Sequence, residues 1–407
     1  MNIFKKLYCR VFQMGFKIAL PLLPYRTPKQ LRSVTDIPEV LKSKKIDSVL
    51  LVTDGGIMSL GLTKPLEECL SANGIRCAVY DKTVPNPTTA NVDEALQIYR
   101  DNACGALIGF GGGSSMDCAK AVGILVAKPG KTLADVKGIL KVHKKLPLLI
   151  AVPSTAGTGS ETTLAAVIVD SETRHKYAIN DFPLIPRYAV LDPKVTLSLP
   201  PRITSTTGMD ALTHAVEAYI GRSTTAGTRK DACTAVALIF ENLDKAVFEG
   251  TDVTARRNML KASFYAGCAF TKSYVGYVHA VAHSLGGEYN IPHGQANAIL
   301  LPVVLEAYGD VIYGKLKRLA IEAKLATEET DSETAAKAFI AAIKDMLVRY
   351  NIGSTLKGIR EEDIPKLAAY ADKEANPLYP VPVLWNAEEL RRFYYAVMEK
   401  EENHADQ

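Results

Sequence analysis

This sequence lacks paired cysteines and dense clusters of positive charge. Its seven cysteines are scattered, odd in number and include no Cys-x-x-Cys pair, so neither a zinc ribbon nor a disulfide framework is supported. Unpaired cysteines of this kind fit a reducing cytoplasm. The 407 residues carry a net charge of only +4, and no Lys/Arg patch interleaves with aromatic residues. Nucleic acid is therefore not an expected partner.

A long hydrophobic run is also missing from the start of the chain. The longest uncharged run there, residues 18–25, is too short to cross a bilayer and contains two prolines. Charges interrupt the apolar residues and no small-residue cleavage site follows, which excludes a signal peptide. Residues 1–26 instead predict an amphipathic helix with Lys6, Arg10, Gln13 and Lys17 along one face. Such a helix can pack on its own fold or on a partner subunit, which the pattern favours, or make a weak contact with an anionic membrane surface.

Strand and helix patterns alternate through the first half of the chain. Strands are predicted at 48–53, 76–80, 105–110 and 148–152, and helices at 62–72, at 92–101 and from residue 115. This alternation predicts an α/β domain with a parallel sheet covered by helices on both faces. After Pro200-Pro201 the strand signals nearly vanish, and helices are predicted at 204–220, 227–248, 252–271, 296–326, 331–349 and 388–400. The predicted organisation is an N-terminal extension over 1–45, an α/β domain over 46–200 and an all-helical domain over 201–407.

A glycine-rich run, GFGGGSSMDCAKAVG at 109–123, follows one of the predicted strands. Gly111, Gly112 and Gly113 let the backbone approach a ligand closely, and the following helix start offers N–H groups suited to a pyrophosphate. Ser114 and Asp117 form a Ser-x-x-Asp capping pattern at that start. A tight turn that binds nothing is the alternative, but three successive glycines exceed what a turn needs.

The order of the nucleotide-site parts is unusual. In the common dinucleotide fingerprint the glycines follow the first strand and an acidic residue ends the second. Here the acidic residue, Asp54, ends the first strand and the glycines come some 57 residues later. A second loop, PSTAGTGSETT at 153–163, places Thr155, Thr158 and Ser160 after another strand, where open α/β sheets bind ligands. The parts match a nucleotide site, but their order tells against an ordinary Rossmann dehydrogenase.

Three of the seven histidines lie in one short stretch, HAVAHSLGGEYNIPHG at 279–294. His279 and His283 share a helical face, and His293 follows a proline at a turn. Asp210 and His214 also share a face of a predicted helix, although Asp210 could instead cap that helix while His214 lies in the core. Together Asp210, His214, His279 and His293 offer three nitrogens and one oxygen, which suits catalytic Zn²⁺ or Fe²⁺ rather than Ca²⁺ or Mg²⁺.

Four stretches carry a family resemblance: GGGSSMDCAKAV, PSTAGTGSE, TGMDALTHAVEAY and HAVAHSLGGEYNIPHGQANAILLP. They resemble the iron-containing (group III) alcohol dehydrogenases of the dehydroquinate synthase-like superfamily, over roughly residues 46–310. The resemblance implies a Rossmann-like N-terminal domain, an all-α C-terminal domain and a homodimer. It implies an NAD-dependent enzyme that interconverts an alcohol and an aldehyde or ketone by hydride transfer, with the alkoxide oxygen bound to Fe²⁺ or Zn²⁺.

The resemblance also assigns roles by position. The family's metal ligands match Asp210, His214, His279 and His293, and His283 matches its extra active-site histidine, which would position the nicotinamide or relay a proton. Its cofactor-binding positions match Gly111, Gly112, Gly113 and Ser114 with Asp117 beside them, then Thr155, Thr158, Lys176 and Asp54. An acid at Asp54 would repel a 2′-phosphate, which favours NAD over NADP. Phe270 and Ala165 match positions near the substrate.

The chain departs from the family pattern near the substrate, where it has AFTKSYVG at 269–276 instead of a run close to AFSNAxLG. The identity of the alcohol therefore stays open. A glycerol dehydrogenase-like zinc polyol dehydrogenase is the alternative within the superfamily, ahead of a phosphate-eliminating dehydroquinate synthase. A non-catalytic nucleotide-binding sensor or assembly protein is the alternative from another class.

Overall fold

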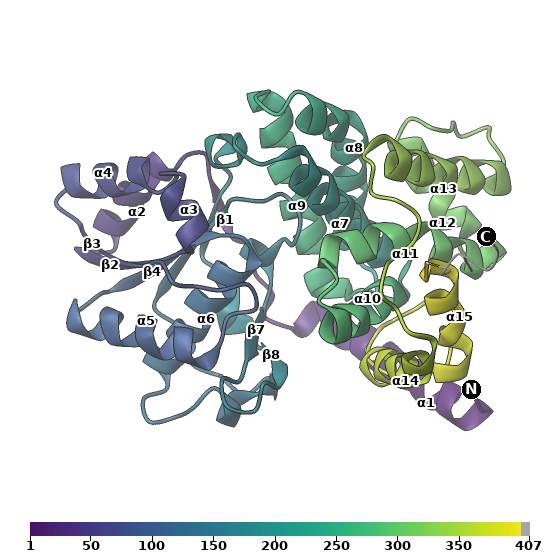
Figure 1. Ribbon diagram of the computed structural model, residues 1–407, viewed down its shortest axis with the longest axis horizontal. Coiled ribbons are helices and arrows are strands. Elements are labelled where there is room, and N and C mark those ends of the chain that lie inside the picture. The colour runs from purple at the N-terminus through teal and green to yellow at the C-terminus, as the bar shows by residue number, and fades with distance from the viewer. Residues whose placement is uncertain (400–407) are drawn as a thin grey trace, which may run out of the picture. The chain divides into compact units, whose positions relative to one another are not determined.

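The computed structural model describes residues 1–399 (Figure 1). The chain divides into two compact units. The helical unit comprises residues 1–23, 200–249 and the chain from Lys272 onward, and the sheet unit comprises residues 24–199 and 250–271. The predicted boundary at residue 200 coincides with one crossing between the units, whereas the N-terminal helix belongs to the helical unit and residues 250–271 belong to the sheet unit.

A six-stranded parallel sheet forms the centre of the sheet unit, in the order β1-β9-β6-β4-β2-β3. The strands are β1 (Lys29–Leu31), β2 (Ser48–Val52), β3 (Arg76–Tyr80), β4 (Ala106–Gly111), β6 (Leu148–Pro153) and β9 (Tyr188–Val190). Every residue of β2 and β4 is buried. Such continuously apolar strands are typical of a parallel sheet covered on both faces, as the sequence predicts.

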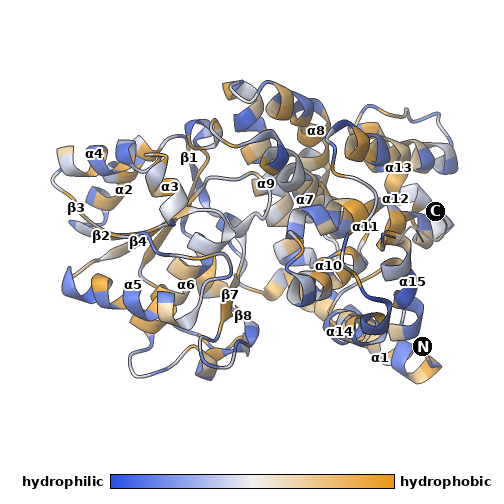
Figure 2. Ribbon diagram, viewed as in Figure 1, coloured by the Kyte–Doolittle hydropathy of each residue, from blue (hydrophilic) through white to orange (hydrophobic). Residues whose placement is uncertain are grey.

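Helices cover both faces of this sheet because successive strand residues point to opposite sides. Leu50 and Val52 pack with α5 (Thr89–Asp101) and α6 (Gly113–Ala127) on one face. Val49 and Leu51 pack with α2 (Ile37–Ser43), α3 (Gly55–Ser59) and α4 (Lys64–Ala72) on the other. Hydrophobic and hydrophilic residues mix along α5 (Figure 2), as expected for a helix with one face on a sheet.

A second, three-stranded sheet escapes the sequence patterns. It has the order β5-β8-β7, formed by β5 (Gly138–Ile139), β8 (Lys176–Asn180) and β7 (Ala165–Val169), and β7 pairs antiparallel with β8. Residues of β7 alternate between buried and half-buried positions, so the strand lacks the continuous apolar run that marks the central strands. The α/β class is confirmed, with this smaller mixed sheet added to it.

The described part of the helical unit contains helices and no strand, as predicted. Its helices are α1 (Ile3–Ala19), α7 (Pro201–Ile220), α8 (Ala226–Phe248), α10 (Tyr277–Tyr289), α11 (His293–Tyr308), α12 (Tyr313–Glu322), α13 (Ser332–Arg349), α14 (Ile364–Ala375) and α15 (Ala387–Val397). Residue 400, the end of one predicted helix, lies outside the described residues. The stretch His293–Glu322 is long and apolar enough to cross a membrane by composition, but 61% of its most apolar window is buried inside the protein.

The prediction of one continuous helix over 296–326 is wrong. Helix α11 ends at Tyr308, because Gly309 adopts a left-handed φ of 57°, and α12 begins only at Tyr313. A similar stop separates α10 from α11, where Asn290 has a φ of 55° and Pro292 precedes the new helix. This tight connection returns the chain, so that His293, the first residue of α11, lies beside α10.

Helix α9 (Val253–Ser273) is shared by the two units. Its Leu260 and Phe264 pack with Leu191, which follows β9. Gly267 lies so close to the loop after β6 that a Cβ there would stand 3.2 Å from the Cα of Gly159. Glycine at 267 therefore permits a close helix–loop approach that any larger residue would prevent.

Candidate metal centre and nucleotide loop

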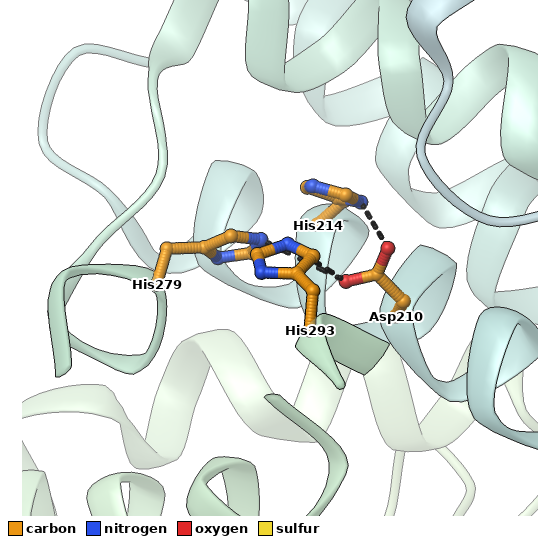
Figure 3. A group of neighbouring side chains, drawn as sticks. All are labelled: Asp210, His214, His279 and His293. Atoms are coloured by element: carbon orange, nitrogen blue, oxygen red, sulfur yellow. Dashed lines mark ion pairs between the residues drawn. The ribbon is translucent and has the colours of Figure 1, made fainter. Parts of the chain in front are cut away.

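Four predicted ligand residues come together within the helical unit (Figure 3). Asp210 and His214 lie one turn apart on α7, His279 lies on α10 and His293 begins α11. One ligand atom from each of the four residues lies within 4.8 Å of the others. Because α7 begins at Pro201, Asp210 is well inside the helix, and the alternative that it caps the helix is wrong.

The chemistry of this quartet fits a divalent transition metal. Asp210, His214 and His279 are buried, whereas the side chain of His293 is 39% exposed. Burial, followed by the neighbouring histidines, holds the pKa of His279 well below its ordinary value, so its ring is neutral. Its Nε2 is buried and has no hydrogen-bond partner among the described residues. Since an unpaired buried nitrogen is costly, a cation at this point would satisfy it.

Two residues that sequence reasoning missed hold the quartet in place. Glu217, a turn beyond His214 on α7, accepts a hydrogen bond from Nδ1 of His279 at 2.6 Å. This bond leaves the Nε2 lone pair of His279 facing the quartet. Asn297, one turn after His293, donates to Oδ1 of Asp210 at 2.7 Å. The signal in the sequence is the helical spacing, because both residues share a helix face with a predicted ligand.

Glu217 is itself tightly constrained. It accepts backbone N–H groups from Gly276 at 2.9 Å and from Val278 at 2.8 Å. Burial raises its pKa to about 7, and those backbone hydrogen bonds act in the opposite direction. The carboxylate thus joins α7 to the start of α10 and orients His279.

Replacement of Glu217 with Gln is expected to weaken metal binding by roughly 10- to 100-fold, the usual cost of losing a partner that orients a ligating histidine. An amide cannot accept the Nδ1–H and both backbone N–H groups as strongly as a carboxylate does. Competition with a chelator, monitored by metal content, measures the effect. Glu241→Gln, at an exposed carboxylate on α8 (61% exposed), is the matched control. Unchanged affinity in Glu217→Gln would show that this contact does not support the metal.

His283 lies one turn after His279 on α10 and outside the set of four ligand residues. Its Nδ1 lies 2.7 Å from Oε1 of Glu374 on α14, which also accepts the hydroxyl of Tyr379 at 2.7 Å. Burial acts to raise the pKa of Glu374, but His283 and these hydrogen bonds outweigh it, so the pKa is lowered. The ring of His283 stacks on that of His293, with centroids 5.1 Å apart. His283 therefore lies between the quartet, through its stacking on His293, and the ionised carboxylate of Glu374.

The glycine loop and Asp54 meet within the sheet unit despite their separation in sequence. Strands β2 and β4 pair in parallel, with Val52 opposite Gly109, so their carboxyl ends lie side by side. Asp54 caps α3, and its second carboxylate oxygen lies 3.4 Å from Oγ of Ser115 in the first turn of α6. The order of the strands in the sheet thus brings Asp54 beside the glycine loop. In the common fingerprint the acidic residue would instead follow the glycines in the sequence.

The first turn of α6 differs from the predicted capping pattern. Its N-cap is Gly112, and no side chain among the described residues caps it. The carboxylate of Asp117 instead accepts hydrogen bonds from Ser160 at 3.0 Å and from the Val167 N–H at 3.1 Å, and lies 3.7 Å from Nζ of Lys120. Burial raises the pKa of Asp117, while Lys120 acts to lower it. The predicted cap is wrong, and Asp117 fixes the loop after β6 to α6.

Two of the other predicted cofactor residues, Thr158 and Lys176, are linked to the same loop. Thr158 lies 3.4 Å from the place that a Cβ on Gly113 would take, and Thr155 lies in the same segment after β6. Lys176, at the start of β8, donates to Asn86 at 2.7 Å, and the Asn86 N–H donates to Ser114 at 3.3 Å. Asn86 is a further residue that the sequence did not mark.

The two predicted substrate-pocket residues also belong to the sheet unit. Ala165 begins β7, and Phe270 lies near the end of α9. Both side chains are half-buried.

Comparison with known proteins places the chain in a family. Residues 29–193 match the family described as iron-containing alcohol dehydrogenase, and residues 204–398 match the C-terminal part of the Fe-containing alcohol dehydrogenase family. Alcohol dehydrogenase 4 of Schizosaccharomyces pombe is 40% identical over 347 residues, covering 84% of this chain and 81% of that protein. The 1,3-propanediol dehydrogenase of Klebsiella pneumoniae is 38% identical over 367 residues, covering 89% of this chain and 93% of that protein.

Among solved structures, a 1,3-propanediol oxidoreductase superposes with a TM-score of 0.88 at 34% identity, covering 92% of this chain and 99% of that chain. The chain belongs to the iron-containing alcohol dehydrogenase family, with its dehydroquinate synthase-like fold. It is an oxidoreductase, an NAD-dependent alcohol dehydrogenase that uses a metal ion. The alternative of a non-catalytic sensor is set aside by this relationship together with the assembled quartet.

Proposed function

We propose that this enzyme prefers NAD(H) to NADP(H), holds Fe²⁺ or Zn²⁺ at Asp210, His214, His279 and His293, and interconverts a small alcohol with its aldehyde or ketone. The observation that carries the metal assignment is the quartet, three of whose residues are buried and in which Nε2 of His279 has no hydrogen-bond partner among the described residues. A cation held there would supply a Lewis acid for an alcohol or carbonyl oxygen. Asp210 contributes the negative charge, and Glu217 keeps His279 in the required tautomer.

We assign to His283 the role of accepting the hydroxyl proton of the alcohol. Its Nδ1 contacts Oε1 of Glu374, which holds the ring in place. When an alcohol is oxidised, hydride leaves its carbon and a proton leaves its oxygen, and His283 is the titratable group beside the quartet that can accept that proton. Glu374 is a positioning residue in this proposal, with Tyr379 fixing the carboxylate from the other side.

The cofactor is assigned to the loop after β4. The backbone of Gly111 to Ser114 would receive the pyrophosphate at the start of α6, where no described side chain competes as a cap. Thr155, Thr158 and Lys176 would contact the rest of the cofactor. Asp54, fixed by its hydrogen bond from the Ile57 N–H at 3.0 Å, would accept from ribose hydroxyls and repel a 2′-phosphate. This repulsion supports NAD(H) as the preferred cofactor.

The substrate is proposed to be a small primary alcohol or its aldehyde. Relatives named 1,3-propanediol dehydrogenase and NAD-dependent methanol dehydrogenase are 38% and 37% identical to this chain. Phe270 and Ala165 are proposed to line the substrate pocket. The chain is also proposed to act as a homodimer in the cytoplasm. Its seven free cysteines support the proposed compartment, because a reducing cytoplasm keeps thiols unpaired.

A steady-state assay tests this proposal. The purified enzyme is expected to oxidise NADH with short aldehydes, to lose that activity with a chelator and to recover it with Fe²⁺ or Zn²⁺. NADPH is expected to give a kcat/KM at least about 10-fold lower, equivalent to ~1.4 kcal/mol. Full activity in the chelator would overturn the metal assignment. Turnover with glycerol or other polyols and Zn²⁺, but not with simple primary alcohols, would instead favour the polyol dehydrogenase alternative.

A further inference from the structure

Helix α1 is attached to the helical unit through a face that carries Arg10 and Gln13 together with the buried Cys9 and with Phe16, whose ring packs on that of Tyr274. The guanidinium of Arg10 donates to the carbonyl oxygens of Val381 at 2.7 Å and Pro382 at 2.8 Å. The amide of Gln13, which is buried, donates to the Tyr379 carbonyl at 2.8 Å. Lys5 pairs with Asp372 at 3.0 Å. These contacts, made at positions 5, 10 and 13, fix how α1 is rotated about its own axis.

The apolar face of α1 consequently points away from the protein. Five side chains at alternating spacings of three and four form a stripe along it, with exposed fractions of 79% for Phe4, 63% for Leu7, 62% for Val11, 64% for Met14 and 70% for Ile18. Ile3, Tyr8, Phe12 and Leu22 are exposed as well, at 76%, 60%, 41% and 86%. A surface helix of a globular protein normally turns its apolar stripe inward, so this reversed orientation marks an interaction surface.

The charge around the stripe indicates the chemistry of the partner. The first 26 residues carry Lys5, Lys6, Arg10, Lys17 and Arg26 and no acidic residue; the first acidic side chain is Asp36. A second copy of α1 would bring like charges together, whereas an anionic lipid surface complements both the basic residues and the apolar stripe. The exposed aromatic side chains of Phe4 in the stripe and of Tyr8 and Phe12 beside it also suit the boundary between lipid headgroups and acyl chains.

The helix also lies outside the part of the chain that matches the enzyme family. That match begins at residue 29, and the solved 1,3-propanediol oxidoreductase is covered over 99% of its own length by 92% of this chain. The residues matched by the two family models, 29–193 and 204–398, therefore exclude α1. A role for α1 can therefore be separate from turnover.

We propose that α1 docks this enzyme on an anionic bilayer, lying in the plane of the interface with the stripe Phe4, Leu7, Val11, Met14 and Ile18 inserted among the lipids. Arg10 and Gln13 hold the helix to the protein, and Lys6 and Lys17, whose side chains stay exposed beside them, contact the anionic headgroups. This inference is independent of the proposed substrate and cofactor, because it concerns a surface that no proposed catalytic residue shares.

Co-sedimentation of the full chain with vesicles tests the proposal. Binding is expected to vesicles of phosphatidylcholine with 30% phosphatidylserine and to be at least about 10-fold weaker to phosphatidylcholine alone or in 0.5 M salt, since lipid charge and screening control it. A Val11→Asp/Met14→Asp variant is expected to lose binding at least about 10-fold. Val348→Asp, at an equally apolar and 78% exposed site on α13, is the matched control and should bind like the parent.

The outcomes separate docking from folding and from catalysis. Turnover of a soluble aldehyde and the far-ultraviolet circular dichroism spectrum are expected to be the same in the parent and in both variants. Failure of the parent to bind the charged vesicles would overturn the proposal, as would equal loss of binding in Val348→Asp. Dimers that dissociate in Val11→Asp/Met14→Asp, with no vesicle binding by the parent, would overturn it and assign the stripe to a second copy of the chain.

Discussion

A His293→Ala protein is expected to fold, to lose its metal and to lose turnover by at least about 1000-fold. The ring begins α11 and is 39% exposed, so its removal leaves no large internal cavity. It supplies one of only four ligand atoms that lie within 4.8 Å of one another in the quartet. Loss of the cation removes several kcal/mol of charge stabilisation from the reaction, and each ~1.4 kcal/mol is a factor of ten in rate.

Metal content and NADH oxidation, measured on the same purified samples, check this result. His175→Ala, at an exposed histidine just before β8, is the control and should match the parent in both measurements. His283→Ala is the informative comparison, because that variant should keep its metal while turnover falls. A His293→Ala protein that retains one metal ion per chain and normal turnover would show that His293 is not a ligand.

Replacement of Gly112 with Ala is expected to leave the stability of the protein nearly unchanged and to weaken NADH binding by at least about 10-fold. A Cβ at Gly112 would meet no atom within 4 Å, and the residue has an ordinary φ of −78°, so the folded chain accommodates it. That empty space at the start of α6 is where a pyrophosphate would approach the backbone. A methyl group there would hold the phosphate away from the N–H groups, and a tenfold loss corresponds to ~1.4 kcal/mol.

Titration of NADH fluorescence and thermal unfolding separate the two effects. Gly111→Ala should behave differently, since its φ is 146° and a Cβ would lie 2.5 Å from Oγ of Ser115; this variant should lose stability as well as binding. Gly314→Ala, in open space on α12, controls for the substitution itself. Unaltered NADH affinity in Gly112→Ala would mean that the cofactor does not approach this loop.

Features with a local cause could be predicted from the sequence. The run SVLLV is buried along its whole length as β2, and the glycines of FGGGS stand where a strand meets a helix. Asp210 and His214 share a face because four residues make one helical turn. The family resemblance then joined these residues to His279 and His293, which the structure brings together, whereas spacing alone would have paired His279 with His283.

Features that depend on distant partners could not be predicted in this way. Asp54 meets the glycine loop because β2 and β4 are neighbours in the sheet, and Glu374 meets His283 from a helix 91 residues further along the chain. The wrong prediction for Asp117 has the same origin, since tertiary packing offered its carboxylate Ser160 and Val167 in place of a local cap.

The N-terminal helix shows most directly how the two kinds of information divide. The sequence by itself determined that α1 is an amphipathic helix with a basic face, because a period of 3.6 residues sorts side chains by chemistry along any helix. The tertiary structure decided which face is turned outward, since the carbonyl groups at residues 379–382 bind Arg10 and Gln13 and leave the apolar stripe exposed. Periodicity is a property of neighbours in sequence, whereas orientation depends on which distant groups can satisfy each polar side chain.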